Sequence, residues 1–88
     1  MTERVFQIKN RLGLHARPAA LFVQEAAKHK SSIVVVKDGL EVNGKSVMGL
    51  MLLAAESGSK LTIKADGPDE EKALDALGKI FDRKFDEE

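Results

Sequence analysis

The chain has 88 residues and no cysteine, which excludes a disulfide framework and a thiolate metal site. A hydrophobic fraction of 43%, a charged fraction of 32% and a formal net charge of zero predict a globular protein with one domain over residues 1–88. No apolar run is long enough to span a membrane, and the N-terminus MTERVFQIKN has no signal-peptide core, so we expect a cytoplasmic protein without membrane insertion. Without Trp or Tyr the chain has few rings on which bases could stack, so we expect no nucleic-acid partner.

The first third of the chain predicts a strand, a loop and a helix. VFQIK at 5–9 alternates as a half-buried strand does, and RLGLH at 11–15 forms the loop. ARPAALFVQEAAKHK at 16–30 predicts a helix, because a proline in the first turn gives up only an amide that has no helical partner. The buried stripe of this helix is expected at Ala19, Phe22, Val23 and Ala26.

The remainder predicts two strands joined by a hairpin, a short helix, a strand and a last helix. SSIVVVK at 31–37 is β-branched, Asp38-Gly39 is a hairpin signal, and LEV at 40–42 continues in extended structure. Ser46 suits the N-cap of a helix over VMGLMLL, with Leu50 and Leu53 in the core. GSKLTIKAD predicts the next strand, and GPDEEKALDALGKIFDRKF opens with a proline and three acids that favour a helix start. Its apolar stripe is expected at Ala73, Leu74, Leu77, Ile80, Phe81 and Phe85.

The predicted order is therefore β-α-β-β-α-β-α. Three helices that are apolar on one side, together with alternating strands, predict an α+β protein in which helices cover one face of an antiparallel sheet. Val34 and Val36 would then lie on the uncovered face of that sheet.

The stretch GLEVNGKS at 39–46 matches the phosphate-binding pattern G-x-x-x-x-G-K-[ST], and so raises a P-loop nucleotide-binding enzyme as one hypothesis. The physical chemistry disfavours it, because Leu40 and Val42 prefer extended structure and Glu41 would place a carboxylate beside the anion. A doubly wound nucleotide-binding sheet also needs several βαβ units, each of 30 or more residues. A strand that leads into the Ser46 cap is the simpler interpretation.

The stretch LGLHARPAA places His15 directly before a helix and Arg17 two residues later. The helix dipole opposes a positive charge there and favours a neutral imidazole, whose ring nitrogen is a nucleophile. A phosphoryl group on that nitrogen would meet the open amides near Ala16 and Arg17 and the Arg17 guanidinium. His29 lies at the other end of the same helix and receives no predicted function.

The run G-L-H-A-R-P-A at 13–19 resembles the active-site signature of the HPr family, the histidine-containing phosphocarriers of the bacterial phosphoenolpyruvate-dependent phosphotransferase system. K-S-V-M-G-L-M at 45–51 resembles the second motif of the family, and the resemblance covers essentially the whole chain. It implies an open-faced β-sandwich, with a four-stranded antiparallel sheet and three helices on one face. It also implies that Nδ1 of His15 accepts phosphate from enzyme I and passes it to a IIA protein or domain, with Arg17 stabilising the adduct.

The resemblance implies no cofactor and no metal, and transient docking of a monomer onto its partners. An apolar rim around the site would bind them, and helical spacing leaves core packing as the alternative for its members. The rim candidates are Ala16, Ala20, Leu21, Val47, Met48 and Met51.

Ser46 matches the serine that a dedicated kinase phosphorylates in many members of the family, which makes a regulatory kinase or phosphorylase a possible partner. FDRKFDEE and LMLLAAESG resemble the nitrogen-related branch, NPr, as much as the sugar branch, so both branches stay open. An interaction module that never carries phosphate would need neither His15 nor Arg17.

Overall fold

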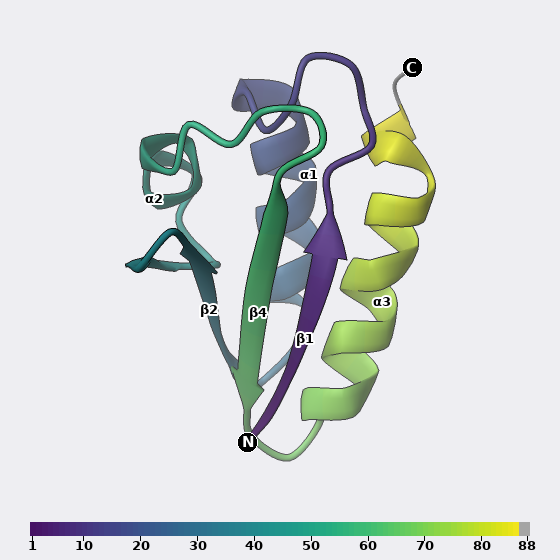
Figure 1. The fold of residues 1–88 in the computed structure, drawn as a ribbon. Coiled ribbons are helices and arrows are strands. Elements are labelled where there is room, and N and C mark those ends of the chain that lie inside the picture. The colour runs from purple at the N-terminus through teal and green to yellow at the C-terminus, as the bar shows by residue number, and fades with distance from the viewer. Residues whose placement is uncertain (87–88) are drawn as a thin grey trace.

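The computed structural model describes residues 1–86 as a four-stranded sheet with three α-helices (Figure 1). The elements are, in chain order, β1 (Thr2–Gln7), α1 (Ala16–Ala27), β2 (Ser32–Lys37), β3 (Leu40–Asn43), α2 (Val47–Leu52), β4 (Lys60–Asp66) and α3 (Glu70–Asp82). A short 3-10 turn, η1 (Lys84–Asp86), follows α3. The predicted order β-α-β-β-α-β-α is confirmed.

The strands lie in the order β1-β4-β2-β3, and every neighbouring pair is antiparallel. All six residues of β1 pair with β4, which pairs on its other side with β2. β2 and β3 form the predicted hairpin, because Asp38 and Gly39 have positive φ angles of 51° and 83°, as a two-residue hairpin turn requires.

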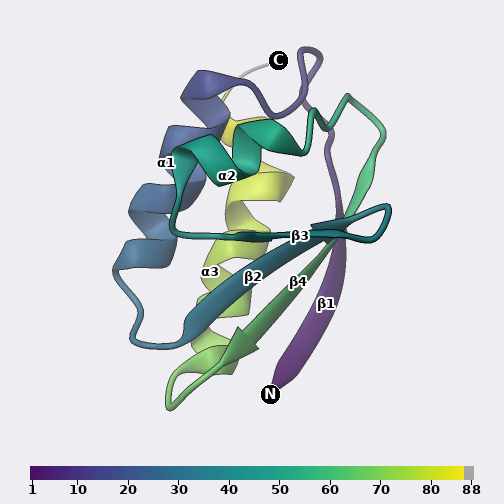
Figure 2. The same cartoon turned by 90° about the vertical axis from the view of Figure 1, so that its left-hand side faces the viewer.

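The core lies between the sheet and the helices, which cover one face and leave the other open (Figure 2). Alternate residues of the central strands β2 and β4 are buried against the helices, while Val34 and Val36 lie half-buried on the open face, as predicted. Phe22 of α1 meets Phe81 of α3 edge to face, with ring centroids 6.1 Å apart. Every residue of the stripe predicted for the last helix is buried.

Three residues predicted for the buried face of a strand or helix are placed differently in the structure. Ile8 lies beyond the end of β1, although its N–H still donates to the Ser59 carbonyl at 2.8 Å. Val23 is half-buried at the margin of the core. Phe85 is buried as predicted, but it reaches the core from η1 with a φ of 54°, because α3 has already ended at Asp82.

Candidate functional site

His15 is the N-cap of α1, so the predicted placement at the start of the first helix is confirmed. Its backbone is extended, with φ −90° and ψ −169°, and its ring makes no capping hydrogen bond to the helix. The His15 carbonyl accepts the first helical bond, from the N–H of Ala19 at 2.9 Å. The side chain is partly exposed. The ring is therefore neither buried in the core nor used to close the helix.

The first turn of α1 presents two backbone amides beside the histidine. The N–H groups of Ala16 and Arg17 precede the first helical bond, and Pro18, which follows, has no N–H. Pro18 is buried and fixes the backbone at this point. The Arg17 side chain is exposed. The turn thus combines backbone donors, an exposed guanidinium and a backbone fixed by proline, which are the groups that bind an anion.

The loop before His15 is held against the segment that follows α2. Leu14 is buried and its N–H donates to the Ala55 carbonyl at 2.9 Å. Gly13 has a φ of 76°, and a Cβ on it would lie 2.5 Å from the Ala55 carbonyl oxygen, so no larger residue fits. The buried side chain of Asn10 donates to the Gly13 carbonyl at 2.7 Å. These contacts fix where the chain enters α1.

Asn10 was not singled out by the sequence. A short polar residue three positions before a glycine is a common turn signal, and here Gly13 N–H also donates to the Asn10 carbonyl at 3.3 Å. The turn could have been predicted from this spacing, but the burial of the amide could not.

Ser46 caps α2 as predicted. Its Oγ accepts from the N–H of Gly49 at 3.0 Å, and its backbone is extended. Asn43 prepares this cap, because its carbonyl accepts from Ser46 N–H at 3.1 Å and its Oδ1 from Lys45 N–H at 2.9 Å. The cap fixes the start of α2, which packs beside α1 (Figure 2).

The six predicted rim residues do not share one environment. Leu21 and Val47 are half-buried against the core, Ala20 is half-buried, and Ala16 is exposed. Met48 and Met51 are 80% and 46% exposed, whereas Leu50 and Leu53 are buried, as expected. Core packing therefore accounts for part of the Leu21 and Val47 surface, and the two methionines form the open part of the rim.

Two further apolar side chains, which the sequence did not single out, are exposed on α2 and in the loop before His15. Leu52 of α2 is 72% exposed, and Leu12 in the loop before His15 is 68% exposed. Leu52 could have been found, because residues three and four positions apart on a helix share a face with Met48. Leu12 carries no such periodic signal, since it lies in a loop.

His29 lies at the opposite end of α1, about 18 Å along a helix of this length. Its Nε2 is 3.2 Å from a carboxylate oxygen of Glu25, and its Nδ1 is 3.5 Å from one of Asp69. The helix has ended at Ala27, so His29 joins α1 to the start of α3. Both ring nitrogens face carboxylates, which is a structural role.

The carboxyl groups with lowered pKa values lie at that same end of the molecule. Hydrogen bonds from the Ser31 hydroxyl and the Lys30 amide hold the pKa of Asp69 well below its usual range. The Thr2 hydroxyl and the Gly67 amide lower the pKa of Glu70. These shifts are explained by contacts between elements and do not concern the His15 site.

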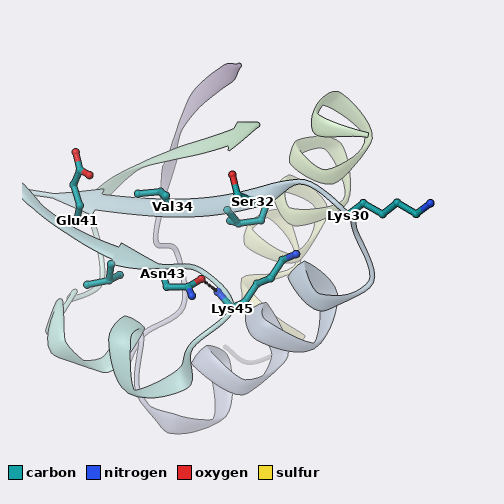
Figure 3. A pocket seen from close by; sticks show the side chains of 8 residues that line it. Lys30, Ser32, Val34, Glu41, Asn43 and Lys45 are labelled. Atoms are coloured by element: carbon teal, nitrogen blue, oxygen red, sulfur yellow. Dashed lines mark hydrogen bonds between the residues drawn. The ribbon is translucent and has the colours of Figure 1, made fainter. Parts of the chain in front are cut away.

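The phosphate-loop hypothesis is excluded by the backbone. Leu40–Asn43 forms β3, paired with β2, and Ser46 caps α2, so residues 39–46 do not wrap around an anion. A groove of about 610 Å³ lies along this hairpin, with Lys30 and Lys45 toward one end and Glu41 toward the other (Figure 3). The groove is lined by Lys30 and by residues of β2, β3 and the turn before Ser46, and none of the predicted site residues borders it. Lys45 Nζ donates a hydrogen bond to the His29 carbonyl at 2.8 Å.

Two features are absent from the part of the chain that the structure describes. Within residues 1–86, no three His, Cys, Asp or Glu side chains are grouped so that they could hold a metal ion. None of the helices in this range has the length and apolar character needed to cross a bilayer.

Comparison with known proteins identifies one family over nearly the full chain. A family model described as PTS HPr component phosphorylation site matches residues 2–83. The phosphocarrier protein HPr of Treponema pallidum is 48% identical over 88 residues, with 100% of both chains covered. The HPr-like protein Crh of Halalkalibacterium halodurans is 53% identical over 77 residues, covering 88% of this chain and 92% of that protein.

Solved structures agree in fold. The crystal structure of HPr-C-His from Thermoanaerobacter tengcongensis superposes with a TM-score of 0.95 at 51% identity, covering 100% of this chain and 99% of the other. A structure of an HPr dimer from the same organism has a TM-score of 0.78 at 50% identity, covering 97% and 98%. The family match, the sequence relatives and the shared sheet order lead to one conclusion: the chain belongs to the HPr family of phosphocarrier proteins.

Proposed function

We propose that the chain accepts a phosphoryl group from phosphorylated enzyme I on Nδ1 of His15 and passes it to a histidine of a IIA protein or domain in the sugar phosphotransferase system. The observation that carries the proposal is the partly exposed imidazole at the N-cap of α1, beside the amides of Ala16 and Arg17. The first helical bond is made by the N–H of Ala19, so the hydrogen bonds of the helix itself leave these two donors open.

The transfer needs few groups from this chain. The lone pair on Nδ1 attacks phosphorus, a new P–N bond forms, and the P–N bond to the donor histidine breaks and returns its electron pair to that ring. The amides of the first turn and the Arg17 guanidinium stabilise the negative phosphoryl oxygens during and after transfer. In the second transfer, phosphorylated His15 is the donor and the histidine of the IIA protein is the nucleophile. Neither a nucleotide nor a metal ion takes part.

Docking is the second requirement, because the donor and acceptor histidines belong to other proteins. The apolar rim, which we define as the rim residues predicted from the sequence together with Leu12 and Leu52, comes from α1, α2 and the loop before His15. Exposed apolar patches of this kind favour transient interfaces. Met48 and Met51 suit a surface that meets more than one partner, since thioether side chains adapt their shape.

Ser46 is proposed as the regulatory position. Its hydroxyl lies at the start of α2, one residue before Val47 and two before Met48, both of which belong to the rim. A phosphate added there by a serine kinase would place negative charge beside the docking surface and repel an acidic partner.

Two neighbouring functions rest on specific observations. An HPr-like protein, Crh, is 53% identical over 77 residues, so an interaction or regulatory module of the same fold that never carries phosphate is a second candidate. The ending FDRKFDEE resembles the nitrogen branch as much as the sugar branch, so a nitrogen-branch carrier with a different IIA acceptor is the other candidate. Both use the same fold, so labelling and acceptor choice distinguish them.

The test is incubation with enzyme I and labelled phosphoenolpyruvate, comparing the wild type with His15→Ala and His29→Gln. We expect acid-labile, base-stable label on the wild type and on His29→Gln, and none on His15→Ala. Arg17→Ala should slow labelling about 10- to 100-fold, the value of one charge-assisted hydrogen bond in the transition state. Equal labelling of wild type and His15→Ala would refute the proposal, whereas an unlabelled wild type would favour the interaction module that never carries phosphate.

Purified IIA proteins of the two branches then serve as acceptors. Preferential transfer to the sugar IIA supports the sugar branch, and preferential transfer to the nitrogen IIA assigns the chain to the other branch.

A further inference from the structure

The chain has few side chains that react rapidly with oxidants. It contains three methionines and no Cys, Trp or Tyr. All three methionines are exposed: the exposed fraction is 75% for Met1, 80% for Met48 and 46% for Met51. Their thioethers are therefore the first groups that a peroxide in the solvent would meet.

The three methionines fall into two places. Met48 and Met51 lie on α2, in the apolar rim beside the start of α1 (Figure 2). Met1 lies at the other end of the molecule, where its amino group is 3.3 Å from a carboxylate oxygen of Glu70 at the start of α3. One pair thus belongs to the docking surface, and the third methionine is a built-in reference with similar exposure.

We propose that Met48 and Met51 form a reversible oxidation site that weakens docking, and so slows phosphoryl transfer, when their sulfurs become sulfoxides. This inference rests on the proposed phosphocarrier function. In the step itself, the thioether sulfur donates an electron pair to one oxygen of hydrogen peroxide, an S–O bond forms, the O–O bond breaks, and water leaves after proton transfer. Sulfur is oxidised by two electrons and the peroxide is reduced. Methionine sulfoxide reductases, which oxidise two thiols to a disulfide, restore the thioether and release water.

The effect follows from the environment of α2. Because Met48 and Met51 point to solvent while Leu50 and Leu53 fill the core, a sulfoxide at either position leaves the fold intact. In the docked complex, however, the same oxygen must lose its hydration against an apolar surface. A polar group buried without a partner in this way weakens an interface about tenfold or more. The loss should therefore appear in docking with both enzyme I and IIA.

The experiment treats the purified chain with hydrogen peroxide and follows sulfoxides by peptide mass spectrometry. Initial rates of labelling by enzyme I and phosphoenolpyruvate are measured below saturation, before and after treatment, for wild type, Met1→Leu and Met48→Leu/Met51→Leu. Each protein is compared with its own untreated form. We expect about a tenfold drop for the wild type and Met1→Leu, and less than about a twofold change for the double variant, since Met and Leu are similar in volume. Sulfoxide reductases with a thiol donor should restore the wild-type rate.

The outcomes separate this inference from the function on which it rests. If the untreated wild type takes no label, the phosphocarrier proposal fails. If it takes label and keeps its rate with sulfoxides at 48 and 51, only the oxidation inference is overturned. The same holds if Met1 is oxidised while the α2 methionines are not, or if the double variant loses as much rate as the wild type. Unfolding midpoints of treated and untreated protein show whether a loss arises from docking or from stability.

Discussion

At the scale of single residues, the site depends on the His15 ring, which does not cap its own helix. A histidine at an N-cap position could have capped its own helix, but the ring makes no such bond, and the burial of Leu14 and Pro18 on either side fixes the backbone instead. The side chain is left at the surface beside the first-turn amides. Ser46 behaves in the opposite way, since its hydroxyl is committed to the Gly49 amide.

Replacing Ser46 with alanine removes that capping bond. We expect Ser46→Ala to lower the free energy of unfolding by about 1 kcal/mol, as loss of an N-cap usually does. Urea unfolding followed by circular dichroism measures it. Ser57→Ala is the matched control, because Ser57 is exposed and outside any helix, and it should change stability by less than about 0.5 kcal/mol. Equal stabilities for wild type and Ser46→Ala would show that the cap contributes nothing.

At the scale of elements, Asp69 joins the start of α3 to the turn between α1 and β2. Its carboxylate accepts from Ser31 Oγ at 2.5 Å, Ser31 N–H at 2.9 Å and Lys30 N–H at 3.0 Å. Asp69 occupies the N-cap of α3, but it makes no side-chain bond to the amides of that helix. Asp69 therefore links two elements. The sequence predicted only that its charge favours the first turn of the helix.

The lowered pKa of Asp69 predicts how stability depends on pH. Because the folded-state pKa lies below the unfolded value of about 3.9, the unfolded chain binds more protons between the two values. The stability from Asp69 is therefore complete above about pH 4 and is lost as the pH falls through the folded-state pKa. Asp69→Asn should lower the unfolding midpoint at pH 7, and its difference from wild type should shrink in acid.

Thermal unfolding between pH 2 and 7 checks this dependence. Ser57→Ala, an exposed position without a titratable group, serves as the control and should give a nearly constant difference from wild type across the range. A difference for Asp69→Asn that grows in acid would contradict the assigned direction of the pKa shift.

The elements also show which features a sequence can reveal. The starts of α1 and α2 were predicted correctly, because Pro18 and Ser46 are local signals that act within a turn. The Ser31–Asp69 contact spans 38 positions along the chain, and the exposure of Leu12 depends on where its loop lies. Such features follow from packing between segments, which no local pattern encodes. For the same reason Phe85 was correctly predicted as buried but wrongly placed on a helix.

At the scale of the whole molecule, the sheet is completed within one chain. β1 pairs with β4 over six residues, and Phe6 stacks on Phe81 of α3 with ring centroids 5.1 Å apart. No exchange of strands between copies is needed to fill the core. We therefore expect a monomer, although an HPr dimer is known from Thermoanaerobacter tengcongensis.

Sedimentation equilibrium tests the oligomeric state. The chain should sediment as a single species of 9.6 kDa, with no dependence on concentration in the micromolar range. A species of twice that mass would contradict the expectation and would require the docking rim to be examined as an interface between copies.

The most direct test concerns the atom that receives phosphate. The protein is labelled with ¹⁵N in its two histidines, incubated with enzyme I and phosphoenolpyruvate, and examined by ¹⁵N and ³¹P NMR in alkaline solution. We expect a one-bond coupling between phosphorus and Nδ1 of His15, with the resonances of His29 unchanged. A coupling to Nε2 of His15, or to either nitrogen of His29, would contradict the proposed mechanism.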